Sequence, residues 1–104
     1  MTDDAIMVLA TNETTNGNYP SDGLELAGGY YTCFVEGTYN GGTVRIEAAV
    51  GKSSNFITLS GATFDAANVS PGTITIGRFC KARAVVSGAG GSTDLTVTLV
   101  PIPR

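Results

Sequence analysis

The sequence YYTCFVEGTYNGGTVRIEAAV, residues 30–50, holds two runs of alternating apolar and polar side chains with a turn between them. Alternation with a period of two is typical of a β-strand that has one buried face. The apolar positions of the two runs are Tyr31, Cys33, Val35, Val44, Ile46, Ala48 and Val50. Asn40-Gly41 lies between the runs, and this dipeptide favours the left-handed backbone of a tight turn. The stretch therefore predicts two antiparallel strands joined as a β-hairpin.

The period of two continues along the rest of the chain, and no segment has a sustained helical period. Strands are expected at Leu24–Glu36, Thr43–Val50, Phe56–Ser60, Ala66–Val69, Thr73–Ile76, Cys80–Ser87 and Asp94–Val100. Ile57 and Leu59 are expected to point inward, and the turn SGAGGS at 87–92 is expected to close a last hairpin. One domain of 104 residues with seven or eight short strands predicts an antiparallel β-sandwich, of jelly-roll or immunoglobulin-like type.

The first part of the chain has a different pattern. AIMVLA at 5–10 is apolar on both faces, which fits either a buried strand or an arm laid against a partner. TNETTNGNYPSDG at 11–23 has Tyr19 as its one large apolar side chain and is rich in turn-forming residues. We therefore expect residues 1–22 to form an extended N-terminal arm and loop, and residues 23–104 to form the sandwich domain.

The charge of the chain excludes several classes of function. Charged residues make up 14% of the sequence, the net charge is −3, and the six basic residues are scattered. Nucleic-acid binding needs clustered Lys and Arg, so that class is set aside. No apolar run reaches the roughly 20 residues of a membrane helix, and the acidic start is unlike a signal peptide. A surface of uncharged polar groups is easier to desolvate than an ionic one, which suits a protein that binds other proteins.

The residues also argue against catalysis and against a cofactor. The chain has no histidine, so a Ser-His-Asp or Cys-His arrangement is impossible. Cys33 and Cys80 lack metal-ligand spacing and are expected to be reduced, with a disulfide between them as the alternative. Asn12, Asn16, Asn18 and Asp22 carry oxygen atoms that could surround a calcium ion, but they lack the ordered spacing of a known calcium loop. We expect a protein that is not an enzyme and holds no metal or cofactor.

Two segments resemble small β-sandwich virion proteins of tailed bacteriophages. They are GTYNGGTVRIE at 37–47 and the ending CKARAVVSG at 80–88 with DLTVTL at 94–99. In those proteins a Gly-aromatic-x-Gly-Gly-Thr-Val hairpin comes early, and a hairpin with Val-Ser-Gly and Leu-Thr-Val comes last. Tyr39 stands where the pattern usually has Trp, and the resemblance covers about residues 30–100. It implies a structural part of the particle of the capsid decoration or cement type, and it names no catalytic or ligand residues.

The expected function is therefore to bind the outer capsid surface and to stabilise the joints between capsid subunits. The expected partners are the major capsid protein and further copies of this chain, with a trimer around local three-fold positions as one arrangement. Neither nucleic acid nor membrane is an expected partner, and the protein is expected on the virion after synthesis in the host cytoplasm. The predicted contact residues are Ile6, Met7, Val8 and Leu9 of the arm, which could add a strand to a neighbour, and Tyr19, Tyr39 and Asn40.

Three alternatives remain open at this stage. One is a phage tail or fibre component. Another is a carbohydrate- or receptor-binding module that uses exposed tyrosines such as Tyr30 and Tyr39. The third is a secreted immunoglobulin-like module in which Cys33 and Cys80 are bonded.

Overall fold

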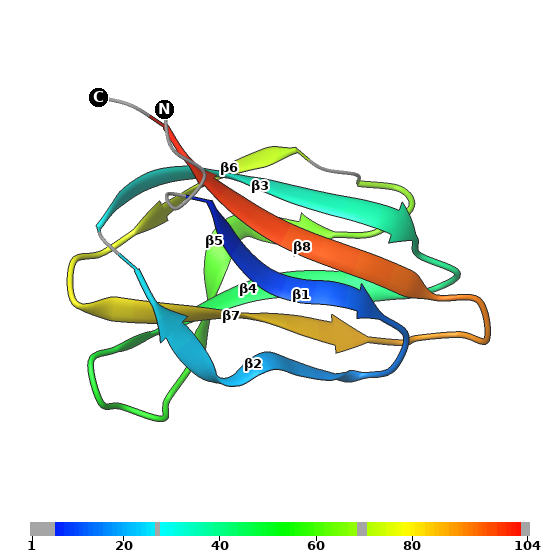
Figure 1. The fold of residues 1–104 in the computed structure, drawn as a ribbon, viewed down its shortest axis with the longest axis horizontal. Helices are drawn as coiled ribbons and strands as arrows, with labels where there is room; N and C mark the ends of the chain where they lie inside the picture. The colour runs from blue at the N-terminus through cyan, green and yellow to red at the C-terminus, as the bar shows by residue number, and fades with distance from the viewer. Residues whose placement is uncertain (1–5, 27, 69–70, 103–104) are drawn as a thin grey trace.

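The chain forms two four-stranded sheets that pack face to face (Figure 1). The computed structural model describes residues 6–26, 28–68 and 71–102, and this part contains no helix. The strands are β1 (Met7–Glu13), β2 (Gly17–Glu25), β3 (Gly29–Thr38), β4 (Thr43–Val50), β5 (Ile57–Phe64), β6 (Gly72–Ile76), β7 (Cys80–Ser87) and β8 (Asp94–Pro101). Sheet A has the order β1-β8-β3-β6 and sheet B has the order β2-β7-β4-β5. The predicted all-β antiparallel sandwich is confirmed.

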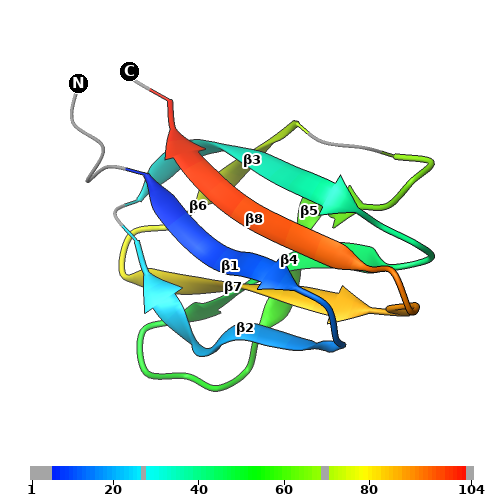
Figure 2. The same ribbon diagram turned by 45° about the vertical axis from the view of Figure 1, so that its right-hand side comes forward.

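The pairing of the strands shows which kind of sandwich this is. The first half of the chain pairs with the second half in reverse order, as β1–β8, β2–β7, β3–β6 and β4–β5. The chain is thus one long antiparallel ribbon of paired strands, closed by the turn between β4 and β5. The strand pairs along the ribbon alternate between the sheets, with β1–β8 and β3–β6 in sheet A and β2–β7 and β4–β5 in sheet B. Within each sheet two strand pairs of the ribbon lie side by side, and they are joined by the pairing of β3 with β8 and of β4 with β7 (Figure 2). This arrangement is a jelly roll, the first of the two types that the sequence left open.

The turn at Asn40-Gly41 forms, but it does not make a hairpin. Asn40 and Gly41 have φ values of 43° and 86°, and the Gly42 amide donates to the Tyr39 carbonyl at 2.8 Å. However, β3 lies in sheet A and β4 in sheet B, so the predicted hairpin is wrong. The turn SGAGGS also connects the two sheets, since β7 and β8 lie in different ones. A tight turn reverses the chain locally, whereas the partner of each strand is chosen by packing of the whole sandwich.

The N-terminal region is part of the sandwich. β1 pairs with β8 and β2 pairs with β7, so the described residues 7–25 form two strands and the predicted arm and loop are wrong there. Residues 1–5 lie outside the described part of the chain. Leu9 and Ala10 are 5% and 4% exposed, whereas Ile6 and Val8 are 40% and 52% exposed, so the described part of this run has one buried face rather than two. β2 tolerates its polar sequence because it is an edge strand, and its pairing skips from Tyr19 to Leu24, which accommodates Pro20.

The core lies between the inner faces of the two sheets and largely follows the predicted alternation. The predicted inward residues that are buried are Tyr31, Cys33, Val35, Val44, Ile46, Ile74, Ile76, Ala82, Ala84, Val86, Leu95, Val97 and Leu99. Ile57 and Val50 are exceptions, because they are 64% and 72% exposed, and on β4 Ala49 is buried in place of Ala48. The register of β4 with β5 shifts between Arg45↔Thr63 and Glu47↔Thr58, and in β5 the buried residues are Ala62 and Phe64. Such an irregularity changes which side chains face the core.

Two isoleucines on neighbouring strands provide a test of the inner face. Ile46 is completely buried on β4, and Ile57 on β5 is largely exposed. We expect Ile46→Ala to lower the free energy of unfolding by about 2–5 kcal/mol, because it leaves a cavity in the core. Ile57→Ala should change it by less than about 0.5 kcal/mol. Urea denaturation of both variants measures the difference, and equal losses would contradict the assignment of Ile46 to the inner face.

Candidate partner-binding surfaces

The outer face of sheet A is nearly free of charge. Because Leu95, Val97 and Leu99 point inward on β8, Thr96 and Thr98 point outward. The strand register places Val8, Thr98 and Phe34 in one row across β1, β8 and β3. We call this surface the threonine face; it consists of Val8, Tyr30, Thr32, Phe34, Thr73, Thr75, Thr96, Thr98 and Val100.

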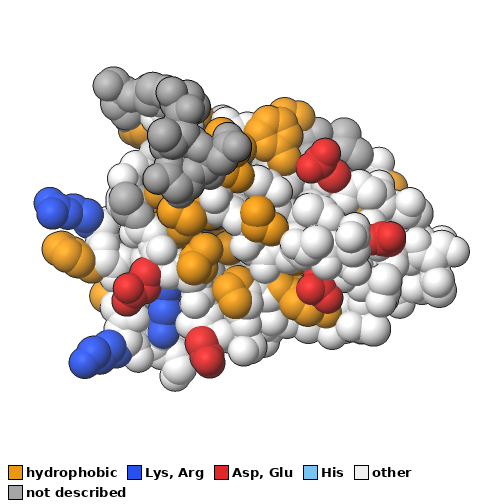
Figure 3. All heavy atoms as spheres, in the orientation of Figure 1, with side chains coloured by type: hydrophobic (Ala, Val, Ile, Leu, Met, Phe, Trp, Pro, Cys, Tyr) orange, Lys and Arg blue, Asp and Glu red, His pale blue; other side chains and the backbone are white. Residues whose placement is uncertain are grey.

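Large apolar side chains are exposed on the threonine face. Val8 is 52% exposed, Tyr30 39% and Phe34 38%. The described residues of the four strands of sheet A include no lysine or arginine. Their acidic residues lie toward the end where β3 finishes and β8 begins, and they are Glu13, Glu36 and Asp94. Figure 3 shows hydrophobic side chains over β1 and β8, with acidic but no basic side chains toward the right-hand end.

The outer face of sheet B differs, because its charged side chains bind one another. Arg83 donates from Nε and Nη2 to Oε1 of Glu47, at 3.1 and 2.9 Å. The Arg83 guanidinium also lies 3.8 Å from the centre of the Phe56 ring. Arg45 lies 3.8 Å from the other carboxylate oxygen of Glu47. These groups are already paired and stacked within the chain, which leaves them less available to a partner.

Polar hydrogen bonds join three loops at one end of the sandwich. The Asn40 side chain accepts from the Ser92 amide at 3.0 Å, and the Asn16 side chain accepts from the Ala89 amide at 2.8 Å. Buried Thr93 donates from Oγ1 to the Tyr39 carbonyl at 2.7 Å and accepts from the Gly90 amide at 2.8 Å. This end is therefore held rigidly by the chain itself.

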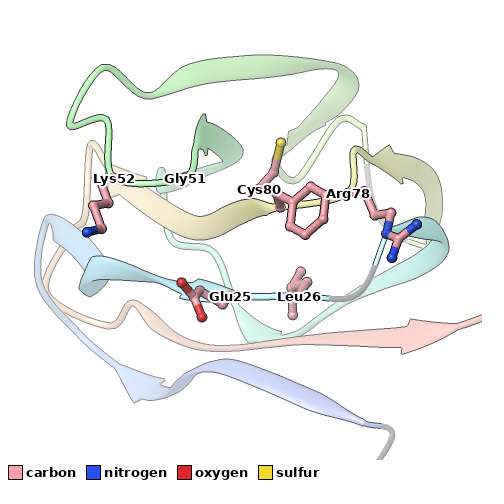
Figure 4. A pocket seen from close by; sticks show the side chains of 7 residues that line it. Glu25, Leu26, Gly51, Lys52, Arg78 and Cys80 are labelled. Atoms are coloured by element: carbon pink, nitrogen blue, oxygen red, sulfur yellow. The ribbon is translucent and has the colours of Figure 1, made fainter.

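The opposite end carries a pocket of about 420 Å³. It is lined by Glu25, Leu26, Gly51, Lys52, Arg78, Phe79 and Cys80, and Figure 4 shows Lys52 and Arg78 on opposite sides of it. Phe79 is 76% exposed and Val50 72%, although both are large and apolar. We call this region, with Val50 and the lining residues, the Phe79 end.

The backbone of the Phe79 end is strained and hydrogen-bonded. Phe79 has a φ of 63°, a conformation that costs free energy in a bulky residue. The Gly51 amide donates to the Phe79 carbonyl at 2.8 Å, and the Leu26 amide donates to the Cys80 carbonyl at 3.2 Å. Three connections, β2–β3, β4–β5 and β6–β7, are thus tied together around the pocket.

The structure separates the predicted contact residues into exposed and packed ones. Val8 and Ile6 are exposed, the latter by 40%, and Asn40 is exposed at its turn. The others are held inside the fold: Leu9 is in the core, and Met7, Tyr19 and Tyr39 pack against it. Packing of this kind removes much of their surface from a partner. That the exposed residues touch a partner stays a prediction.

Sequence reasoning did not propose Phe34 or Phe79 as contact residues. The alternation in β3 predicts that Phe34 points outward. An outward aromatic residue on a strand beside outward threonines could have indicated a contact residue. Phe79 lies in the turn between β6 and β7, where no periodicity predicts the direction of a side chain. In the structure its backbone is left-handed and its side chain is 76% exposed.

The described residues contain no group of three His, Cys, Asp or Glu side chains that could hold a metal ion. Within the same residues, no helix is long and apolar enough to span a membrane. Comparisons of the chain with protein-family models, with curated proteins and with solved structures gave no match.

The two thiols are free and differ in their surroundings. Burial raises the pKa of Cys33 to about 12, whereas Cys80 is partly exposed beside the pocket. Because the thiolate is the reactive form, we expect Cys80 to react with Ellman's reagent at pH 8 in the folded protein, and Cys33 to react only after unfolding. Cys80→Ser should remove the fast phase. Absence of both thiols from the denatured, unreduced protein would mean that they are bonded.

Proposed function

We propose that this protein is a virion structural protein that binds the outer surface of a capsid through its threonine face. In that position it stabilises the joints between capsid subunits. The observation that carries the proposal is the exposure of Val8, Tyr30 and Phe34 on a sheet face without basic residues. The partner is the major capsid protein, and the site of action is the capsid surface.

The physical argument concerns the free energy of removing water from the two surfaces. Threonine hydroxyls and apolar side chains lose less on desolvation than ions do, so a large face of this kind can be buried at low cost. Exposed apolar patches on small proteins mark sites of association. A paired sheet presents these side chains on a rigid backbone, which keeps the entropy lost on binding small.

The fold and the sequence resemblance give separate support. Jelly rolls occur in viral coat proteins, although they also occur in lectins and cupins, so the fold alone does not decide the function. The resemblance to phage virion proteins favours the first of these settings. The alternatives are a tail or fibre component, and a carbohydrate-binding module in which exposed Tyr30 and Phe34 would contact the sugar.

The copy number of this polypeptide in purified particles tests the location. Decoration of a capsid surface needs on the order of hundreds of copies, because every local symmetry position is occupied. Quantitative mass spectrometry of particles measures the number. About a dozen copies would favour the tail or fibre alternative, and complete absence would contradict any structural role in the particle.

A charge placed in the middle of the threonine face tests the docking surface. Thr98 lies between Val8 and Phe34, so Thr98→Lys should weaken binding to undecorated particles at least tenfold, because the ammonium group would lose its water. Asn18→Lys is the control, since exposed Asn18 lies on β2 of sheet B and receives the same charge. Co-sedimentation with particles gives both affinities. Equal binding by the two variants would show that another surface docks.

A further inference from the structure

We propose that the Phe79 end of one copy docks onto the acidic end of sheet A of a second copy, in a head-to-tail contact. This inference goes beyond the proposed function, because it assigns two further surfaces and a contact that forms without the capsid.

The Phe79 end has the features of a preformed binding surface. Phe79 and Val50 keep about three-quarters of their surface exposed, at 76% and 72%. The Arg78 guanidinium lies 5.1 Å from the centre of the Phe79 ring, and Arg with an aromatic residue is a common pair at the centre of interfaces. The strained φ of Phe79 is maintained although the ring gains little burial from it. Strain of this kind gathers at sites where presentation of a side chain matters.

Basic side chains outnumber carboxylates at the Phe79 end, because Lys52 and Arg78 line the pocket together with a single acidic residue, Glu25. Lys52 and Arg78 flank the pocket, and neither forms an ion pair with another residue of the described chain. Arg45 and Arg83, by contrast, are paired with Glu47. A partner that fits this end therefore combines an apolar contact with carboxylates around it.

The other end of the same molecule offers that combination. A groove of about 260 Å³ lies there, lined by Asn12, Glu36, Gly37, Thr38, Asp94 and Thr96. Exposed Phe34 lies two residues before Glu36 on the same face of β3 and supplies an apolar border. Within the described residues, Glu36 and Asp94 have no salt-bridge partner.

The two surfaces cannot meet within one chain. The molecule measures 37 Å along its longest axis, and the connections of the Phe79 end lie opposite those that follow β3 and β7 (Figure 1). Figure 3 shows the visible basic side chains toward the left end of the molecule, with acidic side chains among them, and acidic side chains without basic ones toward the right. Complementary surfaces at opposite ends produce a heterologous contact between copies, which closes into a ring if the rotation allows. The contact borders on the threonine face at Phe34 and Thr96, and the rest of that face, with Val8, Tyr30 and Thr98, lies outside the contact.

Sedimentation of the purified protein alone tests the contact. At roughly 100 µM protein and low salt, we expect oligomers that dissociate on dilution, as a weak interface does. Raising the salt from about 0.05 M to about 0.5 M should weaken association, because the charges at the interface are screened. A protein that remains a monomer throughout would overturn the proposal.

Variants at Phe79 separate the contact from the stability of the fold. Phe79→Gly removes the ring and suits the left-handed backbone, so the thermal midpoint should not fall while association weakens at least tenfold. Ile57→Ala is the control, because it shortens another exposed apolar side chain, on sheet B, and should leave association unchanged. Association of Phe79→Gly with unchanged affinity would overturn the proposal.

A charge exchange identifies the two surfaces as partners. Arg78→Glu and Glu36→Arg should each abolish association, because each places like charges across the contact. The double variant restores opposite charges and should recover most of the affinity. Failure of the double variant to associate, with the fold intact, would overturn the pairing of these two ends. Particle binding by the same monomeric variants is measured separately, so that the capsid proposal is judged on its own result.

Discussion

The structure depends on backbone hydrogen bonds between strands that are distant in the sequence. β8 pairs with β1 on one side and with β3 on the other, and its inner residues Leu95, Val97 and Leu99 are completely buried. The antiparallel ribbon can close around the core only when these pairings form together. Each sheet then hides one side chain of every two, and the remaining side chains define the outer faces. The strand pairing of the ribbon therefore decides which side chains form the threonine face and the outer face of sheet B.

The two outer faces and the two ends of the sandwich differ in charge, in apolar exposure and in hydrogen bonding. Sheet B keeps its charges within the chain, through Arg83, Glu47 and Phe56. Sheet A exposes threonines and apolar residues, which a partner surface can cover at low cost. One end is tied by Asn16, Asn40 and Thr93, whereas the other presents Phe79. A small protein organised in this way can contact a large partner through most of the outer face of sheet A and its own copies through its two ends.

The sequence predicted the faces of most strands but not the partners of the strands. Alternation assigned Tyr31, Cys33 and Val35 inward and Phe34 outward, and the structure agrees. It did not identify β2, because this edge strand has few apolar residues and is held by hydrogen bonds to β7. It also misplaced Ile57, because a register irregularity cannot be read from a period of two. The Phe79 end was missed because Phe79 lies between β6 and β7, where side-chain alternation gives no prediction of exposure.

The sequence by itself determined the all-β class, the antiparallel sandwich, the inward residues of β3 and β8 and the turns at Asn40-Gly41 and at 87–92. These features follow from interactions between residues close in the chain, such as side-chain alternation and the backbone preference of Asn40-Gly41. The strand predicted at Ala66–Val69 is wrong in its described part, because β5 continues to Phe64 and the backbone of Asp65 pairs with that of Asn68 outside any strand. The tertiary structure alone decided that this turn crosses between sheets and that the N-terminal residues 7–25 belong to the sandwich. The physical reason is that strand pairing is set by burial of the whole core, to which residues far apart in the chain contribute together.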